Sequence, residues 1–136
     1  MRRLIPFLLL AGCPKRYSNP NHLIGTKWTG QVTVTTPCEN GGYGGNDLMV
    51  CAVFRSINDE GMLQVDVDWD PNSLKDACDY FQFEGTSHRG LTLTRTDDVE
   101  QTDDQFSLRV TGDRMTGQFQ VHASCQPWQV DLRLVP

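Results

Sequence analysis

The sequence has little basic charge and no long hydrophobic run. The apolar stretch near its start, Leu4–Ala11, is far shorter than the roughly 20 residues that a membrane-spanning helix needs. Asp and Glu outnumber Lys and Arg by 17 to 12, which gives a net charge of -5. This acidic balance argues against a nucleic-acid-binding protein, whose surface has to neutralise phosphates. The 136 residues are enough for one domain.

The sequence also lacks the motifs of nucleophilic catalysis and of metal binding. His22, His88 and His122 are far apart, and no G-x-S-x-G motif presents a serine nucleophile. The segment 66–72 begins like a calcium-binding loop, but Pro71 stands where that loop needs glycine. We therefore expect neither an enzyme nor a bound metal or cofactor.

The N-terminus has the pattern of a secretory leader. Two arginines precede the short apolar core, and small residues follow it. The residues Leu10-Ala11-Gly12-Cys13 resemble the lipobox of bacterial lipoproteins. The resemblance implies that residues 1–12 are a signal peptide and that Cys13 receives diacylglycerol and acyl chains such as palmitate. An ordinary signal peptide and a chance apolar start are the alternatives. The lipobox implies a lipid anchor in the bacterial cell envelope, and of the two membranes we expect the outer one, although the lipobox itself does not choose between them. The domain would then lie in the periplasm or at the cell surface.

The cysteine count agrees with this interpretation. An exported protein with five cysteines has one left over, and lipid on Cys13 would account for it. The other four, Cys38, Cys51, Cys78 and Cys125, are 13, 27 and 47 residues apart. Zinc sites usually contain closely spaced cysteine pairs, so this spacing favours two disulfides.

After a Pro- and Asn-rich tether (residues 13–26), apolar and polar residues alternate with the period of β-strands. The pattern predicts strands over residues 28–35, 48–54, 63–70, 80–84, 91–94, 106–111, 115–122 and 128–134. Eight half-buried strands predict an all-β domain over residues 27–136. We expect an eight-stranded antiparallel up-and-down β-barrel, with a two-sheet β-sandwich as the alternative.

The long connections alternate with short ones, so an up-and-down order places all four long connections at one end. That end is acidic and, because the tether enters at the other, faces away from the membrane. Its exposed tyrosine and carboxylates form a candidate surface for binding another envelope protein; a solvated loop without a partner is the alternative. The candidate residues are Tyr43, Asp97, Asp98, Glu100, Asp103 and Asp104.

Two further pairings follow from the expected barrel. Closure brings strand 128–134 beside strand 28–35, and hence Cys125 near Cys38, so we predict the disulfides Cys38–Cys125 and Cys51–Cys78. A register that pairs Phe83 with Leu91 places Asp79 opposite Arg95 at the barrel mouth. This pair is interpreted as a cross-strand salt bridge, or else as an anchor for a ligand.

The start of the domain, Gly25-Thr26-Lys27-Trp28, resembles the G-x-W signature of the first lipocalin strand, with one extra residue. The resemblance implies that Trp28 closes the barrel base and that the barrel carries a small apolar ligand. The many bulky inward residues instead predict a filled interior. Small barrel lipoproteins that inhibit lysozyme are similar in size, anchoring and disulfide count, which implies a basic protein partner. We therefore expect a non-catalytic envelope lipoprotein that binds a protein, with the lipocalin-like carrier as the alternative.

Overall fold

The computed structural model describes residues 20–38, 47–69, 78–87, 90–97, 104–121 and 125–136. These ranges contain one short 3₁₀ helix and eight strands. The elements are η1 (Pro20–Leu23), β1 (Lys27–Thr33), β2 (Leu48–Ile57), β3 (Leu63–Asp68), β4 (Phe81–Thr86), β5 (Leu91–Arg95), β6 (Gln105–Thr111), β7 (Arg114–Gln120) and β8 (Trp128–Leu134). All eight predicted strands are confirmed. Within the described ranges, no helix is long and apolar enough to cross a membrane.

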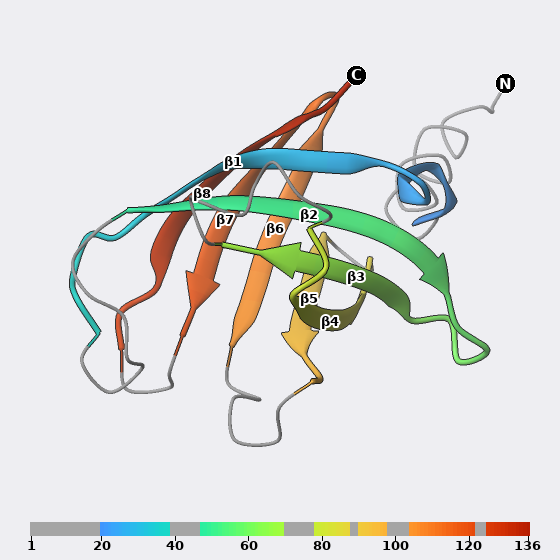
Figure 1. Cartoon of the computed structure of the whole chain (residues 1–136), viewed down its shortest axis with the longest axis horizontal. Coiled ribbons are helices and arrows are strands. Elements are labelled where there is room, and N and C mark those ends of the chain that lie inside the picture. Colours follow the sequence, from blue (N-terminus) through green and yellow to red (C-terminus); the bar gives the residue numbers. More distant parts are fainter. Residues whose placement is uncertain (1–19, 39–46, 70–77, 88–89, 98–103, 122–124) are drawn as a thin grey trace, which may run out of the picture.

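The strands form one closed antiparallel barrel in the order of the sequence, β1 to β8 (Figure 1). The closing pair is β1 and β8, in which Gly30 lies opposite Leu132. On its other side Gly30 lies opposite Val50 of β2. The predicted up-and-down barrel is therefore confirmed, and the alternative of a two-sheet sandwich is wrong.

The interior is occupied by large side chains from alternating strand positions. Two tryptophans and four phenylalanines lie there, each with no more than 2% of its surface exposed: Trp28, Trp128, Phe54, Phe83, Phe106 and Phe119. Leucine, valine and methionine side chains join them in one continuous cluster. Both of these indoles donate a hydrogen bond, Trp28 Nε1 to Thr26 Oγ1 at 2.9 Å and Trp128 Nε1 to the Thr36 carbonyl at 2.8 Å. The inward face of the strands therefore forms a hydrophobic core.

Three interior glycines let neighbouring strands approach closely. A Cβ at Gly30, Gly85 or Gly117 would lie 1.8–2.0 Å from a backbone oxygen of the adjacent strand. Glycine inside a strand often marks such a bend at a barrel corner. In Figure 1, β1 and β2 accordingly run across the direction of β6, β7 and β8.

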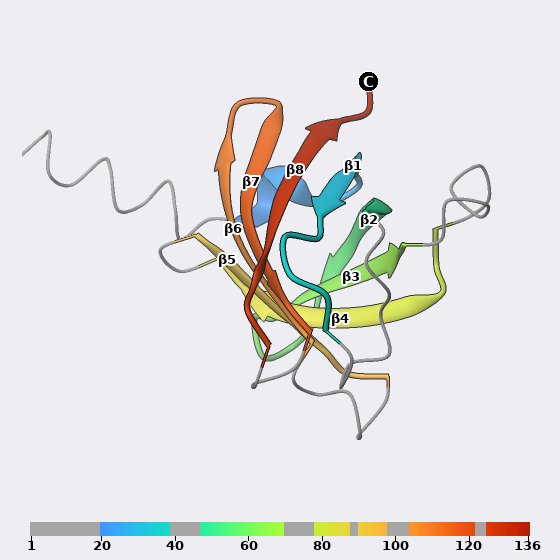
Figure 2. The same ribbon diagram turned by 90° about the vertical axis from the view of Figure 1, so that its left-hand side faces the viewer.

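The two ends of the barrel differ in their connections. The short turns after β2, β4 and β6 lie at the same end as η1 and the start of β1. Figure 2 shows the β6–β7 turn and the C-terminus together at this end. Leu23 of η1 and Trp28 are each 2% exposed there. The connections after β1, β3, β5 and β7 are longer, and the strand ends that flank them lie at the other end of the barrel, hereafter the long-loop end.

The register between β4 and β5 differs from the prediction. Phe83 lies opposite Arg95 rather than Leu91, because β4 continues through Gly85 and Thr86 before the chain turns. Gly85 permits this longer pairing, since its missing side chain leaves space for the backbone of β5. A shift of four residues keeps the same side chains on the inward face, so alternation alone could not distinguish the two registers.

Candidate functional site

Two disulfides fix the long-loop end. Cys38, after β1, is bonded to Cys125, before β8, with a Cα–Cα distance of 5.7 Å. Cys51 of β2 is bonded to Cys78, just before β4, with a Cα–Cα distance of 6.1 Å. Both predicted pairings are confirmed. The first disulfide links two long connections to each other, and the second links a long connection to β2, so this end is cross-linked at two points.

Arg95, the last residue of β5, is held by two carboxylates at the same end. Its Nε lies 2.6 Å from Asp97 Oδ1, and its Nη1 lies 3.1 Å from Asp104 Oδ2. Asp97 Oδ2 also accepts the backbone N–H of Gln82 at 3.1 Å. Asp97 and Asp104, at the two ends of the β5–β6 connection, therefore both pair with the Arg95 guanidinium.

The Arg95 guanidinium is partly desolvated yet stays charged. Burial acts to lower the pKa of Arg95, but the hydrogen bonds and charges of Asp97 and Asp104 outweigh it, and the pKa is raised. The guanidinium carbon lies 4.3 Å from the ring centre of Phe81, close enough for a cation–π contact. Phe81 stacks in turn on Trp69, with ring centres 4.1 Å apart.

This arrangement corrects two predictions. The predicted salt bridge between Asp79 and Arg95 is wrong, because the shifted register moves Arg95 away from Asp79 and toward Asp97 and Asp104. Asp79 itself is exposed. The prediction that Asp104 belongs to the binding surface is also wrong, because Asp104 is fully buried and pairs with Arg95. Asp97 is only 22% exposed at its side chain and is similarly engaged.

The other predicted site residues lie outside the described part of the chain. These are Cys13, Tyr43, Asp98, Glu100 and Asp103.

Sequence reasoning missed Tyr80, which follows the disulfide-bonded Cys78 by two residues. Its surface is 73% exposed, far more than that of the other exposed large apolar residues in the described ranges, Met49 and Val135. The ring packs by one edge on Phe81, with centres 4.6 Å apart. Alternation placed Tyr80 on the outward face of its strand, but it could not show that the exposed ring would pack on Phe81, which contacts the ion-paired Arg95.

The fold and this end together define a closed, core-filled β-barrel that is cross-linked where its long connections meet. Comparison with protein-family models, with curated proteins and with solved structures finds no match to this chain.

Proposed function

We propose that this protein is a non-catalytic lipoprotein of the bacterial cell envelope that binds a basic protein through its long-loop end. The observation that carries the proposal is Tyr80, whose surface is 73% exposed. Its ring packs on Phe81, and it follows the disulfide-bonded Cys78 by two residues. A tyrosine held in this way offers a large contact area at a small cost in conformational entropy, as at the energetic centres of protein interfaces.

The charge around Tyr80 favours a basic partner. Asp79 directly precedes it and is exposed. The β5–β6 connection adds Asp98, Glu100 and Asp103 in sequence, and the whole chain carries a net charge of -5. Opposite charge on the partner would accelerate association and orient the complex.

Export and anchoring are supported by the cysteines. The four cysteines of the domain are consumed by two disulfides, which persist in oxidising compartments. Cys13, at the end of the lipobox, is the one cysteine that these bonds leave over. Acyl chains on Cys13 would hold the barrel at the membrane surface, with its long-loop end directed outward.

The barrel interior does not favour the alternative of a lipocalin-like carrier. A small apolar ligand needs an open cavity of at least about 300 Å³. The inward positions are occupied instead by six tryptophan and phenylalanine side chains that are buried to 98% or more. We therefore place binding on the outside of the barrel.

A binding titration against lysozyme, a basic protein, tests the proposal. The domain should bind lysozyme and reduce its activity on cell walls, and rising salt should weaken the complex because the charges attract at a distance. Tyr80→Ala should weaken binding by about tenfold to thirtyfold, which corresponds to about 1.4–2 kcal/mol.

The matched control is Val135→Ala, which removes an exposed apolar side chain at the opposite end and should leave binding unchanged. The proposal fails if lysozyme neither binds nor loses activity with the domain in large excess. It fails equally if binding occurs and both variants retain it in full.

A further inference from the structure

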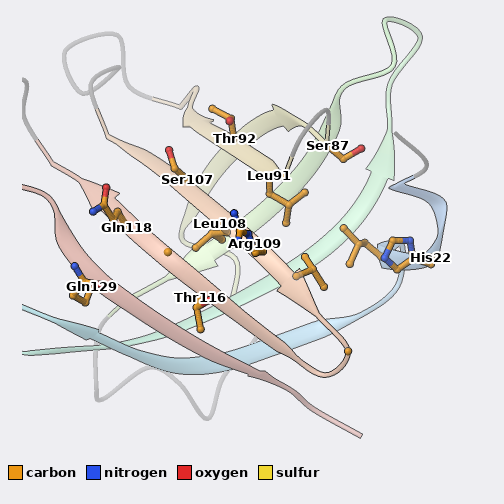
Figure 3. A pocket seen from close by; sticks show the side chains of 15 residues that line it. His22, Ser87, Leu91, Thr92, Ser107, Leu108, Arg109, Thr116, Gln118 and Gln129 are labelled. Carbon is orange, nitrogen blue, oxygen red and sulfur yellow. The ribbon is translucent and has the colours of Figure 1, made fainter. Parts of the chain in front are cut away.

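We infer that the outer face of β5–β8 holds a second site, which binds an acidic oligosaccharide. A hollow of about 1290 Å³ lies on this face and extends toward η1 (Figure 3). Neither Tyr80 nor Arg95 and its partners Asp97 and Asp104 line it.

The polar lining is built from the strand register. Thr92, Ser107, Gln118 and Gln129 are paired successively across β5, β6, β7 and β8, and so form one row across four strands. The next row contains Arg109 and Thr116, which are paired across β6 and β7. Figure 3 shows these side chains on neighbouring strands, with His22 of η1 at one side.

The polar side chains of the hollow are available to form hydrogen bonds with a ligand. Thr92, Ser107, Arg109, Gln118 and Gln129 are exposed. Across the described ranges, neither they nor Thr116 forms a side-chain hydrogen bond or ion pair with the protein. By contrast, exposed Gln31 on the same barrel surface donates to Asp47 at 2.8 Å. Hydroxyl and amide groups donate and accept, as the hydroxyls of a sugar do.

The charge of the hollow points to an anionic ligand. No Asp or Glu lines it, although the chain has 17 of them, and Arg109 places a cation in its second row. The carboxylate in the next position of that row, Asp131, accepts hydrogen bonds from Arg114 Nε at 3.0 Å and Arg114 Nη2 at 2.8 Å. Arg109 therefore remains available for a carboxylate on the ligand.

The size and composition of the hollow favour a saccharide chain over other ligands. Its volume exceeds the roughly 300–1,000 Å³ of pockets for single small molecules, so several linked units fit. The large apolar residues that line the hollow, Leu23, Leu91, Leu108 and Val110, are buried or half-buried, so they offer no exposed anchor for a protein interface. A single arginine is too little charge for a nucleic acid.

Calorimetric titration with defined oligosaccharides tests the inference. Short oligomers of galacturonate, alginate and hyaluronan supply hydroxyls with carboxylates, maltotriose supplies hydroxyls alone, and inorganic phosphate supplies an anion alone. At least one uronate oligomer should bind saturably below about 1 mM, with maltotriose at least about tenfold weaker and phosphate without saturation.

Variants distinguish this site from unspecific attraction. Gln118→Ala combined with Gln129→Ala should weaken uronate binding at least about tenfold, and Arg109→Gln should abolish the preference for uronate over maltotriose. The matched control is Gln82→Ala, an exposed strand glutamine on β4 outside the hollow. It should bind as the original protein does.

Three results would overturn the inference: no saturable binding of any uronate oligomer at about 10 mM, equal binding of phosphate, or binding that the glutamine and arginine variants leave unchanged. All four side chains are exposed, so loss of folding should not obscure the result, and an unchanged melting temperature verifies this for each variant.

Discussion

Replacement of Arg95 by methionine should destabilise the barrel more than any other removal of a single charge in the described ranges. The guanidinium is 11% exposed and binds Asp104, whose side chain is fully buried. Methionine keeps part of the apolar contact with Phe81 but leaves the carboxylate of Asp104 without its cation. Because breaking a buried ion pair strands a charge in an apolar environment, we expect a loss of about 3–5 kcal/mol in the free energy of unfolding.

Urea unfolding followed by tryptophan fluorescence measures this loss. The double variant Arg95→Met/Asp104→Leu should recover part of it, because no buried charge is then left. The control is Arg114→Met, which breaks an ion pair whose side chains are both about half exposed and should hardly move the midpoint. A loss below about 1 kcal/mol for Arg95→Met, or a double variant less stable than the single one, would refute the reasoning.

Three more predictions concern the barrel and its cross-links. Gly117→Ala should cost at least about 1–3 kcal/mol of stability in the same assay, because its Cβ would lie 2.0 Å from a backbone oxygen of β6; an unchanged midpoint would mean that the strands do not approach so closely. Cys38–Cys125 spans 87 residues and Cys51–Cys78 spans 27. Because a longer closed loop restricts the unfolded chain more, replacing both cysteines of a pair by alanine should lower the free energy of unfolding by about 4.5 and about 3.5 kcal/mol, respectively, and the reverse ranking would contradict this reasoning. The hydrogen bond from Arg114 lowers the pKa of Asp131, so Asp131 stabilises the fold above its usual pKa and this contribution fades as acid protonates it. Asp131→Asn should accordingly make the melting temperature slightly less sensitive to pH near about 4, and an identical pH profile would speak against the pair.

The strands and the disulfides could be predicted because they depend on short-range alternation and on closure. Strict period-2 patterning placed Trp28 and Val32 inward on β1, and the closure of β8 on β1 brought Cys125 to Cys38. Each of these features follows from the order of residues along one strand or from the order of the strands.

The details of the long-loop end could not be predicted in the same way. The register of β5 against β4 depends on how far β4 continues, and the close approach at Gly85 decides this. With that register unknown, Asp104 could be read as an exposed loop acid, although its carboxylate is buried against Arg95. The outer hollow likewise needs four strands in correct register, so no single stretch of sequence contains it.

The most direct test of the central claim, an exported barrel held at a membrane by lipid, is the intact mass of the protein from its native cell envelope. We predict a chain that begins at Cys13 with diacylglycerol on its sulfur and in which Cys38, Cys51, Cys78 and Cys125 are all oxidised in pairs. A soluble product that retains Met1 and carries free thiols would contradict the claim.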